Sequence, residues 1–287
     1  YALGGKGNLI CVDIKTGQKI WQKSLPKDLG GKIPGWGYTE SVLIDNGKVI
    51  CTPGGKEGAI AALDAKSGKT LWRTKNFTDG AQYSSPISVV HSGQPQYIQL
   101  VMKNVVGIDP QNGSVLWKTP WAGKVAVIPT PIFSDGFVYI TSGYGVGCKL
   151  IEIGKNAPRE IYANKVMKNH HGGVIKIGEH LYGYSDGVGW TCQEFKTGEL
   201  VWNEKKALGK GAIAYADNRF ICQGEGDGKV ILIEASPNGW KTHGEFIISP
   251  QTKKRNPKGR VWTHPVVCGG KLFLRDQEYI LCYDIKG

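Results

Sequence analysis

The chain has 287 residues and a formal net charge of +12, with 41 glycines and nine tryptophans but only two methionines. Glycines and aromatics in this abundance favour an all-β protein with many tight turns, and the length exceeds one ordinary core unless the fold is a barrel or a ring of repeats. No apolar run approaches the roughly 20 residues that a spanning helix needs, so we expect no membrane-spanning segment.

The first predicted strand, residues 9–12, begins a pattern that returns along the whole chain. The pattern is an apolar strand, an acid, three residues, Gly, three residues and Trp. It holds without gaps after the acids Asp13, Asp64, Asp109 and Glu194, with the tryptophans Trp21, Trp72, Trp117 and Trp202. Weaker copies surround Glu152 and Glu234, and the last copy, residues 280–284, ends with the chain.

The residue types of this pattern have clear structural roles. An acid followed by polar residues and Gly forms a short hairpin turn, because Gly supplies the positive φ that a G1 bulge needs. The Trp then lies on the outgoing strand, where it covers the seam with a neighbouring repeat, and its indole N–H needs a partner such as nearby turn backbone. Because these residues recur once per repeat, we interpret them as structural rather than catalytic.

A second recurrent element precedes each copy and predicts two more strands. Pro86, Pro131 and Pro265 begin three of these elements, and Pro is tolerated at the first residue of a strand. With the acids spaced 40 to 51 residues apart, each repeat is one four-stranded blade. The sequence therefore predicts an all-β protein, a β-propeller of four-stranded antiparallel blades with seven repeats visible and almost no helix.

Strand counting predicts incomplete blades at both ends of the chain. The chain opens at Tyr1 in the second strand of a blade, without an initiator Met or a signal peptide, and ends in the third strand of another. We expect only three strands in the blades that contain residues 1–21 and 260–287. We expect residues 1–287 to form a single propeller domain that lacks its N-terminal strand A, one blade and the closing strand, with further chain upstream.

The acid, Gly and Trp repeats resemble the PQQ-like repeat of the quinoprotein alcohol dehydrogenase-like superfamily, and the whole chain looks like bacterial PQQ-binding-like β-propeller repeat proteins. The resemblance implies an eight-bladed ring and an exported, periplasmic protein. That superfamily includes quinoprotein dehydrogenases, polyvinyl-alcohol dehydrogenases and a non-enzymatic lipoprotein of outer-membrane assembly. The resemblance therefore leaves open whether the chain is an enzyme.

Cysteines bear on the choice of cofactor. In quinoprotein methanol dehydrogenases a vicinal disulfide covers the quinone and a Glu, Asn and Asp site holds calcium. The seven cysteines here include no adjacent pair, so PQQ with Ca²⁺ lacks that support and the cofactor stays unknown. Cys11, Cys192 and Cys282 each lie two residues before a repeat acid, which predicts small buried hydrophobic side chains.

The segments that lead into the first strand of each blade should meet on one face of a propeller, around the central channel. Aromatic rings, imidazoles and a lysine without nearby acids would there suit a flat anionic ligand. In the alternative interpretation, these side chains only plug the channel. The expected ligand-binding residues are Trp36, Tyr38, Tyr83, Thr130, His170, His171, Lys210, Trp262 and His264.

Two other features predict no site. Adjacent side chains on a strand point in opposite directions, so His170 and His171 do not predict a metal site. The basic run 253–260 contains Pro and Gly and predicts a solvated loop rather than a nucleic-acid patch.

Two functions follow from the sequence. The first is a non-catalytic propeller of the cell envelope that binds a ligand or scaffolds protein partners. The alternative is a PQQ-dependent quinoprotein oxidoreductase, for which Glu40 is the candidate general base.

Overall fold

The computed structural model describes residues 1–154 and 157–286, so Gly287, at the end of the last predicted blade, lies outside the described residues. Within them the chain forms 26 strands and one helix, α1 (Leu25–Leu29), which begins at the N-cap Ser24 with Pro26 in its first turn. No helix in this part of the chain has the length and apolar character to cross a membrane. The predicted near-absence of helix is confirmed.

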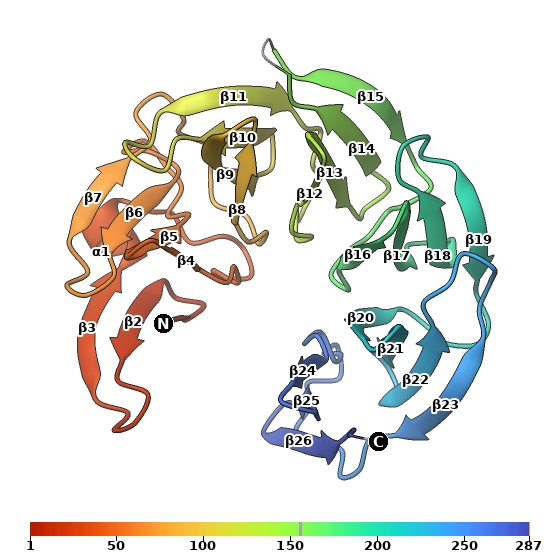
Figure 1. Ribbon diagram of the computed structural model, residues 1–287. Coiled ribbons are helices and arrows are strands. Elements are labelled where there is room, and N and C mark those ends of the chain that lie inside the picture. Colours follow the sequence, from red (N-terminus) through yellow and green to blue (C-terminus); the bar gives the residue numbers. More distant parts are fainter. Residues whose placement is uncertain (155–156, 287) are drawn as a thin grey trace. The chain divides into compact units, whose positions relative to one another are not determined.

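The strands form seven antiparallel sheets, and the strands of each sheet follow one another in chain order (Figure 1). The first blade is β1 (Ala2–Leu3), β2 (Asn8–Val12) and β3 (Lys19–Ser24); the second is β4 (Leu43–Asp45), β5 (Lys48–Cys51), β6 (Ala61–Asp64) and β7 (Thr70–Arg73); the third is β8 (Ile87–His91), β9 (Gln94–Leu100), β10 (Asn104–Ile108) and β11 (Val115–Pro120). The fourth is β12 (Ile132–Ser134), β13 (Phe137–Ser142), β14 (Gly147–Glu152) and β15 (Arg159–Asn164).

The fifth blade is β16 (Val174–Ile177), β17 (His180–Ser185), β18 (Gly189–Glu194) and β19 (Leu200–Glu204); the sixth is β20 (Gly211–Ala216), β21 (Arg219–Gly224), β22 (Lys229–Glu234) and β23 (Thr242–Ile247); the seventh is β24 (Val266–Cys268), β25 (Lys271–Asp276) and β26 (Tyr279–Asp284). The chain is a seven-bladed β-propeller segment of four-stranded antiparallel blades, as predicted. The first and seventh sheets have three strands each, which confirms the strand count. An eighth blade remains a prediction.

The chain divides into two compact units. The first unit holds Tyr1–Ile140 with Ile151–Glu160, and the second holds Thr141–Leu150 with Ile161–Gly287. The division passes through the sheet of the fourth blade. The single domain expected from the sequence remains a prediction.

Trp21 and Trp72 each join their blade to the next one through two contacts. The indole N–H of Trp21 donates to the carbonyl of Ala65 (2.8 Å), and that of Trp72 donates to the carbonyl of Pro110 (3.1 Å), each residue directly following the next acid. The same indole packs on the next blade's Gly: at Gly68, with φ of +70°, an added Cβ would lie 2.8 Å from the Trp21 ring. The repeat Gly thus provides both the turn conformation and room for the neighbour's indole.

The second unit varies this contact. Tyr162 replaces Trp on β15, and its hydroxyl donates to the carbonyl of Phe195 (3.0 Å), again the residue after an acid. The indole of Trp202 donates to the carbonyl of Ser236 (3.2 Å). The predicted turn-backbone partner of the indole is therefore confirmed for three of the four tryptophans, and it belongs to the next blade in each case.

Three details of the sequence analysis were wrong. Trp21 and Trp72 are buried at 9% exposure each, but Trp117 and Trp202 are only half-buried, and Trp117 donates to the Gln96 side chain instead of turn backbone. The three prolines lie just before β8, β12 and β24 rather than in them. Cys11 and Cys192 are buried, but Cys282 is exposed because β26 pairs only with β25 among the described strands.

Candidate functional site

The predicted ligand-binding residues fall into two groups, one in each compact unit. In the first unit, Trp36 is 61% exposed and contacts Tyr83 edge-on, with ring centroids 5.9 Å apart. The backbone N–H of Trp36 donates to the Tyr83 hydroxyl (3.3 Å). Tyr38 is buried and donates to the carbonyl of Pro53 (2.9 Å), while Thr130 is exposed. Trp36 and Tyr83 are thus brought together, whereas Tyr38 is a core residue.

Glu40 is a buried carboxyl group in the first unit. Glu40 is only 4% exposed, and its Oε1 accepts the backbone N–H of Thr52 (2.6 Å). Its Oε2 has no hydrogen-bond partner among the described residues. Burial raises the pKa of Glu40 to about 7, although the bond from Thr52 opposes this shift. Such a group can hold a proton near neutral pH, but it is not open to solvent.

His170 and Lys210 meet in the second unit. The Lys210 ammonium donates to Nδ1 of His170 (2.6 Å) and pairs with Asp186 (2.8 Å), while the ring of Tyr144 contacts His170 edge-on at 4.6 Å. Burial lowers the pKa of His170 to about 4, and the positive charge of Lys210 acts in the same direction. The imidazole is therefore neutral at neutral pH and is an acceptor for the lysine.

His171 and Trp262 share one carboxylate. His171 Nε2 lies 2.7 Å from Glu225 Oε2, and the Trp262 indole N–H donates to the same oxygen (3.1 Å). Burial acts to raise the pKa of Glu225, but the hydrogen bond and charge of His171, with Lys210 and Trp262, hold it below its usual value. The carboxylate is ionised and only accepts, so Nε2 of His171 donates. His264 Nε2 donates to the carbonyl of His171 (2.6 Å).

These contacts tie the fifth, sixth and seventh blades together within the second unit. They also overturn one premise, since Lys210 was expected to have no acid nearby. The loop after β17 brings Asp186 to it, and the turn after β21 brings Glu225 to His171. Lys210 and His171 are each paired with a carboxylate and His170 is neutral, so this cluster is not net cationic. The predicted flat anionic ligand stays a prediction.

Cofactor chemistry finds little support in the described residues. They contain no group of three or more His, Cys, Asp or Glu placed to hold a metal ion, and none of their seven cysteines forms a disulfide. These residues do not fit a calcium-held quinone covered by a vicinal disulfide.

The basic loop 253–260 differs from its prediction at one residue. Arg255 is not solvated as predicted, because it pairs with the fully buried carboxylate of Asp276.

The recurrent hairpin turn and the Trp contact between blades define a β-propeller of PQQ-like repeats. A family model described as "Outer membrane protein assembly factor BamB" matches residues 1–204, which is more than half of the sequence. The chain belongs to this family.

Individual relatives agree with that family. BamB from Yersinia pestis is 27% identical over 139 residues (45% of this chain, 32% of that protein), and BamB from Moranella endobia (strain PCIT) is 26% identical over 200 residues (66% and 49%). The chain thus spans about a third to a half of the length of these relatives. The dehydrogenase subunit of an alcohol dehydrogenase (quinone) from Acetobacter aceti is 36% identical over 73 residues, but only 23% of this chain and 10% of that protein are covered.

Among solved structures, BamB from Moraxella catarrhalis superimposes with a TM-score of 0.69 at 17% identity, covering 97% of this chain and 78% of that one. At this identity the likeness concerns the fold alone.

Proposed function

We propose that this chain is a non-catalytic scaffold of the bacterial cell envelope that binds protein partners during the assembly of outer-membrane proteins. The observation that carries the non-catalytic part is that the polar side chains leading into the blades of the second unit pair with one another: His171 with Glu225, and Lys210 with Asp186 and His170. These pairs fix adjacent blades to one another, and each of the paired groups already has a polar partner within the second unit. Family membership supports the envelope process.

The partner that suits the exposed residues is a protein. Trp36 in the first unit is 61% exposed and Trp262 in the second is 52% exposed. Both lie on segments that lead into a blade, and both are held from one side, Trp36 by Tyr83 and Trp262 by Glu225. A large aromatic side chain held in place but open to solvent is typical of an anchor residue at a protein interface.

The proposal is tested by exporting the chain in a bacterium that lacks its own outer-membrane assembly factor. Folded barrel proteins in the outer membrane are then quantified by their heat-modifiable migration on gels. We expect partial restoration by the wild-type chain and less by Trp36→Ala and Trp262→Ala. Ile14→Ala is the matched control, because Ile14 is apolar and 96% exposed but lies in a hairpin turn.

A second arm tests the enzyme alternative. The purified chain is incubated with PQQ and Ca²⁺, and dye reduction is measured with primary alcohols. We expect no quinone absorbance retained after gel filtration and no dye reduction. Alcohol-dependent dye reduction that Glu40→Gln removes would overturn the non-catalytic proposal and assign the buried carboxyl as general base.

A further inference from the structure

The seam tryptophan has a fixed place in its blade. It is the third residue of the outermost strand, and it pairs with the residue before the bulge of the preceding strand: Cys11 with Trp21, Ala62 with Trp72, Gly107 with Trp117 and Cys192 with Trp202. In the sixth blade the third residue of β23 is Gly244, and it pairs with Leu232 at the same kind of bulge. Strand position and register therefore both place Gly244 where other blades have Trp.

A longer turn accompanies the exchange. Trp follows the acid by eight residues in four blades, whereas Gly244 follows Glu234 by ten. The tryptophan of this repeat, Trp240, lies in the lengthened turn and packs back towards the fifth blade, with ring centroids 5.9 Å from Trp190 and 6.5 Å from Trp202. Its N–H donates to the hydroxyl of Thr242 (3.1 Å). The indole of the sixth repeat, Trp240, thus packs at the seam between the fifth and sixth blades and not at the seam between the sixth and seventh.

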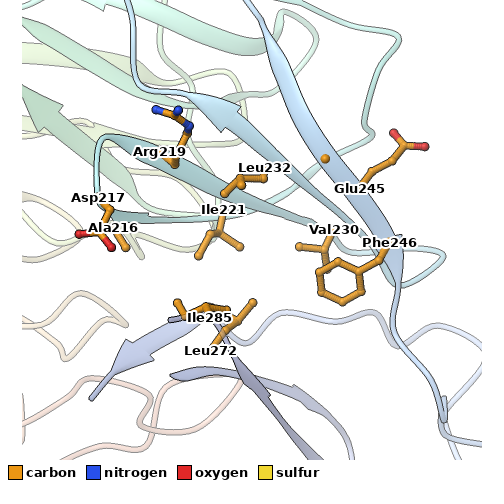
Figure 2. Close-up of a pocket in the computed structure, with 11 residues that line it drawn as sticks. Ala216, Asp217, Arg219, Ile221, Val230, Leu232, Glu245, Phe246, Leu272 and Ile285 are labelled. Carbon is orange, nitrogen blue, oxygen red and sulfur yellow. The ribbon is translucent and has the colours of Figure 1, made fainter. Parts of the chain in front are cut away.

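A pocket of about 310 Å³ occupies the vacated seam, entirely within the second unit. Figure 2 shows Ile221, Val230 and Phe246 on one side and Leu272 and Ile285 on the other. Gly244 lines this pocket, and an added Cβ there would meet no atom within 4 Å. An apolar cavity of roughly 150 Å³ is enough to bind benzene, so this one has room for an indole. We call it the Gly244 pocket.

The pocket also keeps the polar feature of the other seams. Ile285 directly follows the acid Asp284, as Ala65 and Pro110 follow theirs, and the carbonyls of Ala65 and Pro110 accept the indole N–H of the preceding blade. An indole in the Gly244 pocket would find apolar walls and a carbonyl in the equivalent place. That combination suits tryptophan better than a purely aliphatic side chain, because the indole N–H needs an acceptor when it is buried.

We propose that the Gly244 pocket receives a tryptophan side chain of the partner protein, which replaces the missing seam indole. The inference rests on the proposed scaffold function, for which it names a docking site. The rim adds apolar surface for a polypeptide, since Phe246 on β23 is 37% exposed. Tryptophan is also enriched among the residues that contribute most to binding at protein interfaces.

The pocket is tested directly by methyl NMR with N-acetyl-L-tryptophanamide as the probe. We expect ring-current shifts at the methyl groups of Ile221, Leu272 and Ile285 in the wild-type chain. Gly244→Trp fills the pocket from within, so binding should weaken at least tenfold while the melting temperature rises. Ile247→Trp is the matched control, because it adds an indole to the same strand outside the pocket lining. Shifts that persist in Gly244→Trp, or that occur elsewhere in the chain, would overturn the inference. If Gly244→Trp does not fold, Gly244→Leu provides the filled variant.

The same variants in the outer-membrane assembly assay separate this inference from the function on which it rests. Restoration by the wild-type chain and Ile247→Trp, but not by folded Gly244→Trp, supports the docking site. Full restoration by Gly244→Trp refutes the docking site and leaves the scaffold function standing. If no variant restores assembly, the scaffold function fails, and the NMR titration still decides whether the pocket binds an indole. Wild-type dimers that Gly244→Trp converts to monomers in sedimentation would make a second copy the occupant and overturn the assignment to a partner protein.

Discussion

In the first unit, buried indoles close the seams after the first and second blades, through Trp21 on Ala65 and Trp72 on Pro110. In the second unit, a tyrosine, a half-buried Trp202 and Gly244 take the same positions. Both units keep the hairpin turn and the strand order. The comparison shows that the repeat specifies the blade strictly, whereas the filling of each seam varies, and a vacated seam position is where a pocket arises.

The segments that lead into the first strand of each blade also differ between the two units. In the first unit they bury Tyr38 and a single carboxyl, Glu40, away from solvent. In the second unit they form ion pairs, His171 with Glu225 and Lys210 with Asp186, at partly exposed positions. In these segments the first unit therefore relies on burial and the second on polar pairing. Three experiments sharpen this contrast.

The largest effect is expected at the buried seam. Trp72→Ala should lower the free energy of unfolding by about 3–5 kcal/mol, because it removes a buried indole and leaves a cavity. Trp202→Ala should lower it by roughly half as much, since less of that indole is buried. Urea unfolding of each variant measures both changes. Equal losses would remove the contrast, and a loss below about 1 kcal/mol at Trp72 would contradict the seam role itself.

The free energy of unfolding should depend on pH in opposite directions through Glu40, which is buried, and Glu225, which is half-buried. Burial raises the pKa of Glu40 from 4.5 to about 7, so between these values the folded state holds a proton that the unfolded state releases. Stability should therefore fall as pH rises through this window, by about 3 kcal/mol in total. The pKa of Glu225 is lowered, so its contribution is present at neutral pH and is lost as pH falls through the folded pKa.

Urea unfolding of the wild-type chain, Glu40→Gln and Glu225→Gln from pH 4 to pH 8 measures these slopes. Glu40→Gln should lose the decline towards high pH, and Glu225→Gln should lose the decline towards low pH. A Glu40→Gln variant with the wild-type slope would show that this carboxyl group is not desolvated.

The smallest effect is expected at Lys210. Burial is the main cause of the low pKa of His170, about 4, and Lys210 is the next. Lys210→Met should raise that pKa towards, but not to, the ordinary 6.5, as followed by NMR titration of the ring protons. The unfolding free energy should change by less than about 1 kcal/mol, because the pair with Asp186 is partly exposed. Lys229→Met, which breaks the pair with Glu245 instead, should leave His170 unchanged.

The blade could be predicted from the sequence because the acid, Gly and Trp have fixed spacing and each has a local physical role. The recipient of the indole N–H could not, since Ala65 and Pro110 are neighbours of Trp21 and Trp72 only through the contact between blades. The place of Gly244 at the Trp position could not be predicted either, because the gap-free spacing after Glu234 puts Thr242 at that position of the sixth repeat.

The candidate site was predicted in part. Residues on equivalent segments of neighbouring blades do meet in the second unit, as His170 with Lys210 and His171 with Trp262 illustrate. Their acids were missed, because Asp186 and Glu225 lie in turns on another part of the blade and nothing in the local sequence ties a turn to the imidazole of its neighbour.

The indole contact between blades also bears on how such a chain grows by duplication. A regular junction draws Trp from one repeat and the Gly and acceptor carbonyl from the next, as Trp21 does with Gly68 and Ala65. A repeat copied as a whole carries the receiving half of one junction and the donating half of another. Inserted between any two blades, it completes both at once. Gene duplication can thus lengthen the array without new compensating mutations. A neighbour inserted after the sixth repeat, which has lost its donating half, would find no indole.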